Sequence, residues 1–597
     1  MAYLRYFPLR KEHKSITGAV PQGTPVRFYV QTDARECVLL VREDGADFST
    51  EYAMERVEGG FQVSFLPTET GLFFYSFKAD SRFYGLDESI YGAKMGGKEF
   101  LLTVHLASFA TPEKWKGGIM YQIFPDRFAR EGDTTVDGKK ILREDWGGTP
   151  TYEPVNGKVL NNDFFGGNVQ GVLSKLDYLA TLGITSIYLN PIFKAASNHR
   201  YDTSDYSQID GTFGSEQEFE AFLQECKKRG ISVILDGVFN HTGDDSIYFN
   251  KYGTHETLGA YQSKESPYYD WYDFFVYPNK YEAWWGIDIL PAVNDDRESF
   301  REYIAGENGI LAKWQRLGVD GWRLDVADEL SDSFIRVIRD RVKREDGQAL
   351  LIGEVWEEAD EKVAYNVRRA YLQGAELDSV MNYPLKNAIL RTARYGDFSH
   401  VYGVMRKLVD RYPKCVLDVL MNSLSTHDTN RVLTELSGIA IQCKSERAGY
   451  KMNDQRRELA RSREKLAAAL QFFLPGIPCI YYGDEIGMEG YEDPFNRRCF
   501  PKDGKGDEEL LSYYRTLATV RRGIPLFKTG EYVPIKESHG AYVFARVDGE
   551  DAVIIAFNGG DAPYGVDFKS PVKEWMSGKT ATHHTVKRNS VSVFYRE

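Results

Sequence analysis

The stretch VDGWRLDVADE, residues 319–329, combines a short apolar run with a group of acidic residues. The run VDGWRLDV is typical of a buried strand. Because side chains alternate along a strand, Arg323 and Asp325 share one face and can adjoin. Asp328 and Glu329 fall beyond the strand, where a solvated or loop-binding role is the ordinary expectation. The stretch therefore predicts a strand that ends in a charged site, with Asp325 as its reactive carboxylate.

Seven further apolar runs follow the same pattern, and amphipathic helices are predicted between them. The eight candidate strands are GIMYQIF, ITSIYLNP, ISVILDGVF, VDGWRLDV, ALLIGEVW, LDSVMNY, VLMNSLS and IPCIYYG. One intervening helix begins with a capping-box pair, Ser215 and Glu218, and ends near Gly230. Eight such units predict an α/β fold, a closed (β/α)8 TIM barrel over residues 113–524, with its active site at the C-terminal ends of the strands.

Three other regions flank or interrupt this barrel. Residues 1–110 contain β-like runs such as CVLLVREDG and TGLFFYSFKA, which predict an N-terminal β-sandwich. Residues 242–297, after the third strand, are predicted to form an aromatic-rich inserted domain. A connection of this length usually has a function of its own. Residues 525–597 return to short strands and predict a C-terminal β domain.

The composition excludes several classes of partner. The 597 residues carry a formal net charge of −13 without a basic stripe, so nucleic acid is not expected to bind. No run approaches the ~20 apolar residues that span a bilayer, and the N-terminus has no secretory apolar segment, so no membrane partner is expected. Six widely spaced cysteines lack paired zinc spacing and are expected to be reduced in a cytoplasmic protein. Neutral or small substrates fit this composition better.

Charged and polar residues collect at the predicted C-terminal ends of four strands. They are Asp236, Asn240 and His241 on the third strand, Arg323 and Asp325 on the fourth, Glu354 on the fifth, and His427 and Asp428 on the seventh. A single Asp or His at such a place is usually a structural hydrogen-bonding partner. Carboxylates at three strand ends, with two histidines and an arginine, instead indicate a site for a substrate or a metal.

Two of these carboxylates suit glycoside hydrolysis with retention, which needs one ionised and one protonated carboxyl group. Asp325 is the expected nucleophile, because Arg323 is expected to lower its pKa and keep it ionised. Glu354 is the expected acid and base, since Val355 and Trp356 give it an apolar setting that favours the protonated form. The third carboxylate, Asp428, would stabilise a positively charged transition state, and His241 and His427 would donate hydrogen bonds to sugar hydroxyls.

The motifs DGVFNH, GWRLDVADE, GEVW and STHD resemble, in order and separation, the four conserved regions of the α-amylase family of glycoside hydrolases, glycoside hydrolase family 13. GIMYQIFPDRF and residues 164–206 are similar to the neopullulanase, cyclomaltodextrinase and maltogenic-amylase branch. WWGIDILPAVN and GEVWEEA look more like amylopullulanase-type members. The resemblance covers most of the chain, including the sandwich, which looks like that branch's carbohydrate-binding-type domain. It implies a retaining α-glucan hydrolase for α-1,4, and also α-1,6, bonds in malto-oligosaccharides, cyclodextrins, pullulan or starch.

The resemblance also implies roles for individual residues. It makes Asp325 the nucleophile, Glu354 the acid and base, and Asp428 the transition-state stabiliser. The residues that match its substrate-binding positions are Arg323, His241 and His427, together with Tyr201, which matches the aromatic residue that stacks on the sugar at the cleavage site. Asp328 replaces an asparagine of the branch on the acceptor side. Further expected substrate contacts are Trp356 and Trp285, the latter as part of a wall, with Trp284, at the barrel mouth.

A family calcium site near the first barrel loop is partly retained. Its expected oxygen ligands are Asp133, Asp137, Gly166 and Asn168, whereas Glu131 and Val136 stand where asparagines are expected. This Ca²⁺ would be structural, and no cofactor is required for the reaction itself. The resemblance further implies a monomer, or a homodimer formed through the N-terminal domain.

Three alternatives remain open on the sequence alone. A 4-α-glucanotransferase would pass the glycosyl group to an acceptor hydroxyl instead of water. An α-1,6-glucosidase of the same family would prefer panose or isomaltose to maltotriose. A non-catalytic glucan-binding protein would lack one of the three carboxylates, and none is missing.

Overall fold

A closed parallel barrel forms the centre of the protein, whose computed structural model describes residues 3–538 and 540–595. The strand order is β25-β22-β21-β18-β15-β12-β27-β26. A parallel bridge between Met381, next to β25, and Met421, in β26, joins the two ends of the sheet. The strands are β12 (Met120–Ile123), β15 (Ser186–Leu189), β18 (Ser232–Gly237), β21 (Gly321–Leu324), β22 (Leu350–Gly353), β25 (Ser379–Val380), β26 (Met421–Ser423) and β27 (Ile477–Tyr481). Each lies within one of the eight predicted runs, so the TIM barrel is confirmed.

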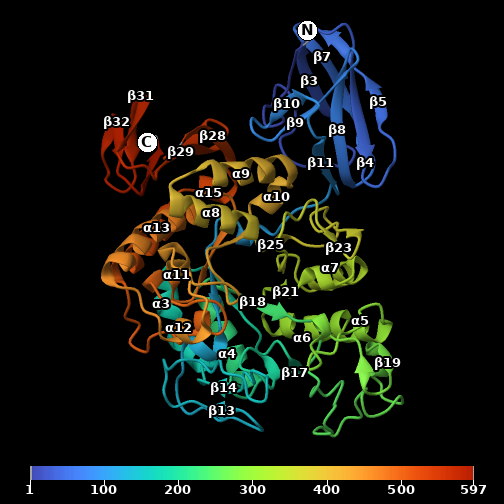
Figure 1. Ribbon diagram of the computed structural model, residues 1–597, viewed down its shortest axis with the longest axis vertical. Helices are drawn as coiled ribbons and strands as arrows, with labels where there is room; N and C mark the ends of the chain where they lie inside the picture. The colour runs from blue at the N-terminus through green and yellow to red at the C-terminus, as the bar shows by residue number, and fades with distance from the viewer. Residues whose placement is uncertain (1–2, 539, 596–597) are drawn as a thin grey trace. The chain divides into compact units, whose positions relative to one another are not determined.

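Amphipathic helices surround these strands (Figure 1). They include α4 (Glu216–Lys228), α7 (Asp332–Glu345), α8 (Tyr383–Tyr395) and α13 (Asp454–Phe473). In α4, both hydrogen bonds of the predicted capping box are present between Ser215 and Glu218. Gly230, just after the helix, has a φ of 67°, which glycine adopts without steric cost. The local sequence thus sets both ends of this helix.

The N-terminal region forms the predicted β-sandwich. One sheet has the order β1-β3-β7-β6, and the other contains the path β10-β9-β8-β11-β2 with β4 and β5 beside it. Apart from β3, the strands are β1 (Leu4–Arg5), β2 (Val20–Pro21), β4 (Cys37–Glu43), β5 (Thr50–Ala53), β6 (Glu55–Val57), β7 (Gly60–Phe65), β8 (Gly71–Ala79), β9 (Arg82–Asp87), β10 (Gly92–Met95) and β11 (Phe100–His105). Residues of β3 (Val26–Thr32) alternate between buried and half-buried positions, as expected when one face packs on a core. The buried residues between the sheets include Phe28, Tyr75, Phe77 and Phe100.

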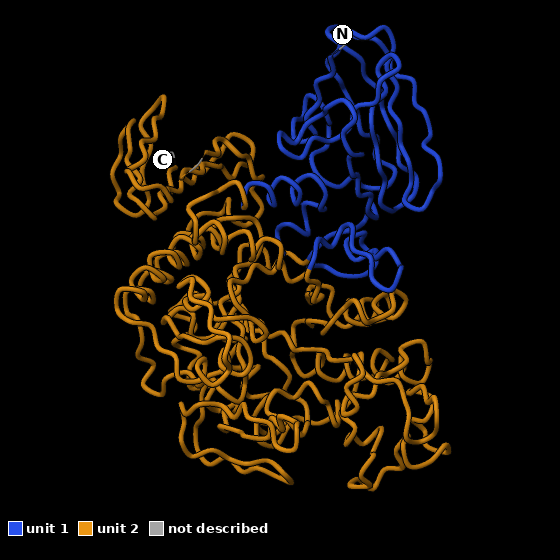
Figure 2. The backbone as a smooth tube through the Cα atoms, in the orientation of Figure 1, with its two compact units in different colours: residues 1–111, 357–379, 401–420 blue, residues 112–356, 380–400, 421–597 orange. Residues whose placement is uncertain are grey.

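The chain divides into two compact units, which Figure 2 shows in different colours. The first unit joins residues 1–111 to two later segments, residues 357–379 and 401–420. Within this unit Lys14 Nζ lies 2.7 Å from Asp410 Oδ1, and the two side chains are 0% and 3% exposed. The predicted boundaries at residues 110, 113, 524 and 525 stay predictions, but the unit that contains the sandwich extends beyond residue 110.

The insertion after β18 and the C-terminal region each have structure of their own. The insertion contains η2 (Tyr269–Trp271), β19 (Phe274–Val276), β20 (Lys280–Tyr281) and η3 (Trp284–Gly286). Many of its aromatic rings contact one another, mostly edge to face, and Phe274 stacks on Tyr269 with centroids 5.4 Å apart. Six strands, from β28 (Glu531–Ser538) to β33 (Ser590–Tyr595), form the C-terminal sheet. None of the helices in the described part of the chain has the length and apolar character needed to cross a membrane.

Candidate active site

Arg323 on β21 is surrounded by three carboxylates, and we call this group the Arg323 cluster. Its Nη1 lies 2.7 Å from Asp236 Oδ1 and 2.8 Å from Asp325 Oδ1, and its Nη2 lies 2.7 Å from Glu354 Oε2. Asp236 is on β18, Asp325 follows β21 and Glu354 follows β22. Because these three strands are neighbours with parallel pairing, their C-terminal ends meet at one mouth of the barrel.

The charge of the Arg323 cluster favours retention of a proton. Three ionised carboxylates around one guanidinium would leave an excess of negative charge in a buried place, so full ionisation is unfavourable. Burial raises the pKa of Asp325 well above its usual range, Arg323 works in the opposite direction, and Glu354 and Asp236 add to the increase. Arg323 lowers the pKa of Asp325, as predicted, but burial outweighs the arginine and the net shift is upward.

Glu354 is held by polar contacts on both carboxyl oxygens. Its Oε2 accepts a hydrogen bond from the backbone N–H of Val326 at 2.9 Å, and its Oε1 accepts one from Trp356 Nε1 at 3.0 Å. The indole of Trp356 is in turn stacked on Tyr383, with ring centroids 3.9 Å apart. The apolar setting predicted for Glu354 was wrong, since Trp356 presents its N–H edge and not its apolar face.

Val326 has a strained backbone next to Asp325. Its φ of 37° lies in the left-handed region, which is unfavourable for a β-branched residue by an order of 1–3 kcal/mol. This conformation turns the chain from β21 into η4 (Ala327–Glu329) and aims the Val326 N–H at Glu354. The strain therefore links the position of Asp325 to the position of Glu354.

Asp428, after β26, is held in its ionised form. His427 Nε2 lies 3.0 Å from its Oδ2 and Arg497 Nη2 lies 3.4 Å from its Oδ1. Burial works to raise the pKa of Asp428, but His427 and Arg497 outweigh it and hold the pKa well below its usual range. The side chain remains 32% exposed, so this carboxylate is accessible to a ligand in the barrel mouth.

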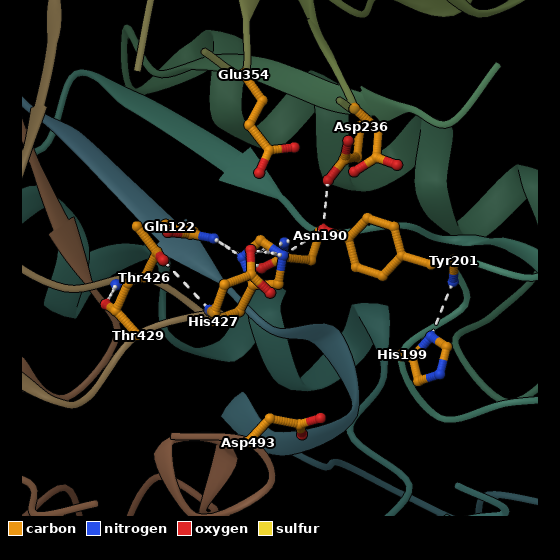
Figure 3. Close-up of polar contacts among 12 residues, drawn as sticks. Gln122, Asn190, His199, Tyr201, Asp236, Glu354, Thr426, His427, Thr429 and Asp493 are labelled. Carbon is orange, nitrogen blue, oxygen red and sulfur yellow. Dashed lines mark hydrogen bonds and ion pairs between the residues drawn. The ribbon is translucent and has the colours of Figure 1, made fainter. Parts of the chain in front are cut away.

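A hydrogen-bond network connects His427 to the Arg323 cluster (Figure 3). His427 Nδ1 lies 2.9 Å from Gln122 Nε2 and 3.2 Å from Asn190 Nδ2. Because both amide nitrogens are donors, Nδ1 accepts and the ring proton sits on Nε2. Nε2 is 2.6 Å from the Tyr201 hydroxyl, which donates to Asp236 Oδ2 at 2.8 Å. The Tyr201 ring also stacks on His427, at a centroid distance of 5.3 Å.

The rings of His241, Trp284 and Trp285 stack in series, from the buried His241 to the exposed Trp285. His241 stacks on Trp284 at 5.2 Å, and Trp284 stacks on Trp285 at 5.2 Å. His241 is buried and its Nε2 lies 2.9 Å from the Tyr201 carbonyl oxygen. Burial lowers the pKa of His241 to about 4, although the Tyr201 carbonyl opposes this, so the ring is neutral at pH 7. Trp285 is 77% exposed, and its Nε1 donates to Glu329 Oε1 at 3.1 Å.

The other residues predicted to bind substrate are Asp328 and Trp356. Asp328 is half-buried on η4, beyond the end of β21. Trp356 is 44% exposed beside Glu354. Polar residues that sequence reasoning did not select also take part: Gln122, Asn190, Tyr188 and Arg497. The first three stand in or just after apolar strands, a signal that the sequence contains, whereas Arg497 ends the short 3-10 helix η6 (Phe495–Arg497), which no apolar run marks.

The residues predicted to bind calcium do not fit a calcium site. The Asn168 side-chain oxygen accepts hydrogen bonds from the N–H groups of Glu131 and Gly171, and Gly166 O accepts one from Thr134 Oγ1. Asp133 is exposed, and Asp137 lies 3.1 Å from Lys140 Nζ. That ammonium also lies 2.7 Å from the buried Asp210. Lys140 thus supplies positive charge to the carboxylates of this loop.

The fold and the geometry define a barrel enzyme with a cluster of carboxylates at the C-terminal ends of its strands. Residues 122–521 match the alpha-amylase catalytic domain, so the chain belongs to the alpha-amylase family.

Individual relatives support this assignment. The chain is 37% identical over 506 residues to an amylopullulanase of Thermoanaerobacterium saccharolyticum, a match that covers 76% of this chain but only 38% of the relative. It is 35% identical over 468 residues to a cyclomaltodextrinase of a Bacillus species, with 75% of this chain and 74% of the relative covered. Among solved structures, the type III pullulan hydrolase of Thermococcus kodakarensis aligns over 100% of both chains with a TM-score of 0.70 and 26% identity.

Proposed function

We propose that this protein is a retaining α-glucan hydrolase that cleaves α-1,4 bonds, and also α-1,6 bonds, in malto-oligosaccharides, cyclodextrins, pullulan or starch. The observation that carries the proposal is the Arg323 cluster, in which Asp325 and Glu354 contact one guanidinium. Retention needs two carboxyl groups that share a site and differ in protonation. A cluster that favours one retained proton meets that need. The reaction requires that this proton lie on Glu354 and that Asp325, whose pKa is raised by burial, be ionised; Arg323 supports this division because it lowers the pKa of Asp325.

In the proposed mechanism, Asp325 and Glu354 divide the chemistry. A carboxylate oxygen of Asp325 bonds to the anomeric carbon while the glycosidic C–O bond breaks, and Glu354 transfers its proton to the leaving oxygen. A water molecule then attacks the same carbon, Glu354 takes a proton from the water, and Asp325 is released. The N–H donors of Val326 and Trp356 orient the Glu354 carboxyl group for both proton transfers.

The neighbouring residues position the sugar and its developing charge. The carboxylate of Asp428 is ionised and its side chain is 32% exposed, so it is suited to stabilise a positively charged transition state. Tyr201 offers an aromatic face at the same place, while its hydroxyl stays bound to Asp236 and His427. Trp285, Trp356 and Asp328 would contact the acceptor side of the glucan.

We further propose that the natural substrates are short or cyclic glucans inside the cytoplasm. The exposed Trp285 and the hydrogen bond from it to Glu329 add a wall at the barrel mouth. A walled mouth admits a short or curved chain more readily than a large branched polymer. The protein would act as a monomer, or as a homodimer formed through the N-terminal domain.

Products from cyclodextrin, pullulan and soluble starch, compared side by side, test this function. Wild-type protein is expected to release maltose and short oligosaccharides whose reducing ends first appear as the α-anomer, as followed by proton NMR. Release of the β-anomer would contradict retention. Elongated chains in place of shorter ones would indicate a glucanotransferase, and cleavage of panose but not maltotriose would indicate an α-1,6-glucosidase. No product from any substrate would favour a binding protein.

A further inference from the structure

A cavity of about 620 Å³ adjoins the proposed active site within the second compact unit. Asp428 and Asn430 line it from the segment after β26, and Glu435 lines it from α11 (Val432–Ser437). Its other wall is α8, which contributes Lys386 and Arg391. Because Asp428 belongs to both places, a glucan that reaches Asp428 can extend into this cavity.

Lys386 is the unusual member of the lining, because it is 6% exposed. Among the residues that the structure describes, none forms a hydrogen bond or an ion pair with its ammonium group, whose Nζ lies 5.9 Å from the centre of the Tyr383 ring. Burial lowers the pKa of Lys386 to about 8, and the nearby Glu435 opposes this shift. A lysine whose side chain is largely buried and whose ammonium group faces the cavity without a partner in the described part of the chain is well placed to bind a ligand there.

The carboxylates of the cavity already have partners. Glu435 accepts a hydrogen bond from Asn430 at 2.9 Å, Asp428 contacts His427 at 3.0 Å, and Glu492 pairs with Arg447. The lining also carries three cations, Lys386, Arg391 and Arg394, so its formal charges balance and favour neither an anionic nor a cationic ligand. A sugar hydroxyl both donates and accepts, so it can accept from the Lys386 ammonium while a neighbouring hydroxyl donates to a carboxylate. The chemistry of the lining therefore fits a neutral glucose unit.

We propose that Lys386 binds a hydroxyl group of a glucose unit that lies in the cavity, past the one held by Asp428, and so sets the chain-length preference of the enzyme. This inference rests on the proposed α-glucan hydrolase function. Lys386 acts in binding and takes no part in bond cleavage. Its contribution appears only for substrates long enough to place a sugar in the cavity.

The test compares Lys386→Met with wild type on maltotriose, maltotetraose and maltohexaose. A hydrogen bond from a charged donor is worth about 1.5–3 kcal/mol, so kcat/KM on maltohexaose is expected to fall by about 10-fold or more, mainly through KM. On the shortest substrate that is cleaved, the expected change is less than about 2-fold, within the range of surface substitutions. In an inactive Asp325→Asn background, the Kd for maltohexaose should rise by the same factor.

Two control variants separate a direct contact from a general effect of charge. Lys227→Met removes an exposed cation from α4 and is expected to leave every substrate unchanged. Arg391→Met removes an exposed cation from the cavity rim and is expected to have a smaller effect than Lys386→Met. Lys386→Gln serves as a second variant if the methionine protein does not fold.

Three results would overturn the inference: an unchanged KM on maltohexaose, an equal loss at all chain lengths, or an equal loss in Arg391→Met. If wild-type protein cleaves none of these oligosaccharides, the proposed function itself fails, and the binding measurement still reports on Lys386.

Discussion

Replacement of Lys386 by methionine should make the protein more stable at pH 7, even though it weakens substrate binding. Burial shifts the pKa of Lys386 from its usual 10.5 to about 8. The fall of this pKa from 10.5 to about 8 means that the charged form costs the folded state about 3 kcal/mol. At 6% exposure solvent screens this cost little, and methionine fills a similar volume without the charge.

The effect has a definite pH dependence. Below pH 8 the lysine is charged in both the folded and the unfolded chain, so the folded state carries the full cost. Between pH 8 and pH 10.5 the folded chain has lost the proton while the unfolded chain keeps it, so the free energy of unfolding rises with pH. Above pH 10.5 the lysine is neutral in both states. The advantage of the methionine variant should therefore be largest below pH 8 and disappear by pH 10.5.

Thermal unfolding at pH 7 and pH 10 measures this difference. For a chain of 597 residues, about 3 kcal/mol corresponds to a rise in Tm of about 2 °C at pH 7. The exposed Lys227→Met variant, which loses the same charge, should show no rise. If Lys386→Met has a lower Tm than wild type at pH 7, the ammonium is stabilised by its surroundings and the reasoning about an unpaired buried cation is refuted.

Four further outcomes follow from the site and its surroundings. Asp325→Asn and Glu354→Gln should each fold and lose more than 90% of kcat on maltotriose, a barrier increase above ~1.4 kcal/mol; retained activity would contradict the assigned roles. Asp328→Asn should keep kcat but alter product ratios in chromatography, and loss of turnover would make Asp325 the wrong choice. Lys140→Met should lower stability by about 1–3 kcal/mol, because the buried Asp210 carboxylate loses one cationic partner but keeps Arg200 at 3.5 Å, whereas a chelator should leave the wild-type Tm unchanged. Finally, kcat/KM per accessible linkage should be higher for maltohexaose than for amylopectin, and the reverse order would argue against a walled mouth.

The barrel was predictable because its strands are continuous apolar runs and its functional carboxylates follow them directly. Asp236, Asp325 and Glu354 stand at or just after the ends of three strands, so parallel pairing was enough to place them at one mouth. The capping box of α4 was readable for the same reason, since Ser215 and Glu218 are three residues apart. Information of this kind is local, or depends only on the order of elements.

Other features depend on contacts that local sequence does not specify. The net pKa shift of Asp325 results from a balance between burial and Arg323, and the sequence indicates the arginine but not the depth of burial. The hydrogen bond from Trp356 to Glu354 depends on a side-chain rotamer that is fixed by stacking on Tyr383. Lys386 resembles any surface lysine of an amphipathic helix until the helix is packed. None of these was available from periodicity.

The composition of the first compact unit has a consequence for how the protein is made. The sandwich strands are synthesised before Asp410, the partner of their buried Lys14, which follows Lys14 by 396 residues. Until then the nascent chain holds a lysine that the finished protein leaves 0% exposed, without the carboxylate that neutralises it. The N-terminal residues therefore do not constitute a module that completes its folding during early translation. The Lys14–Asp410 pair of the first unit can form only when most of the barrel sequence has been synthesised.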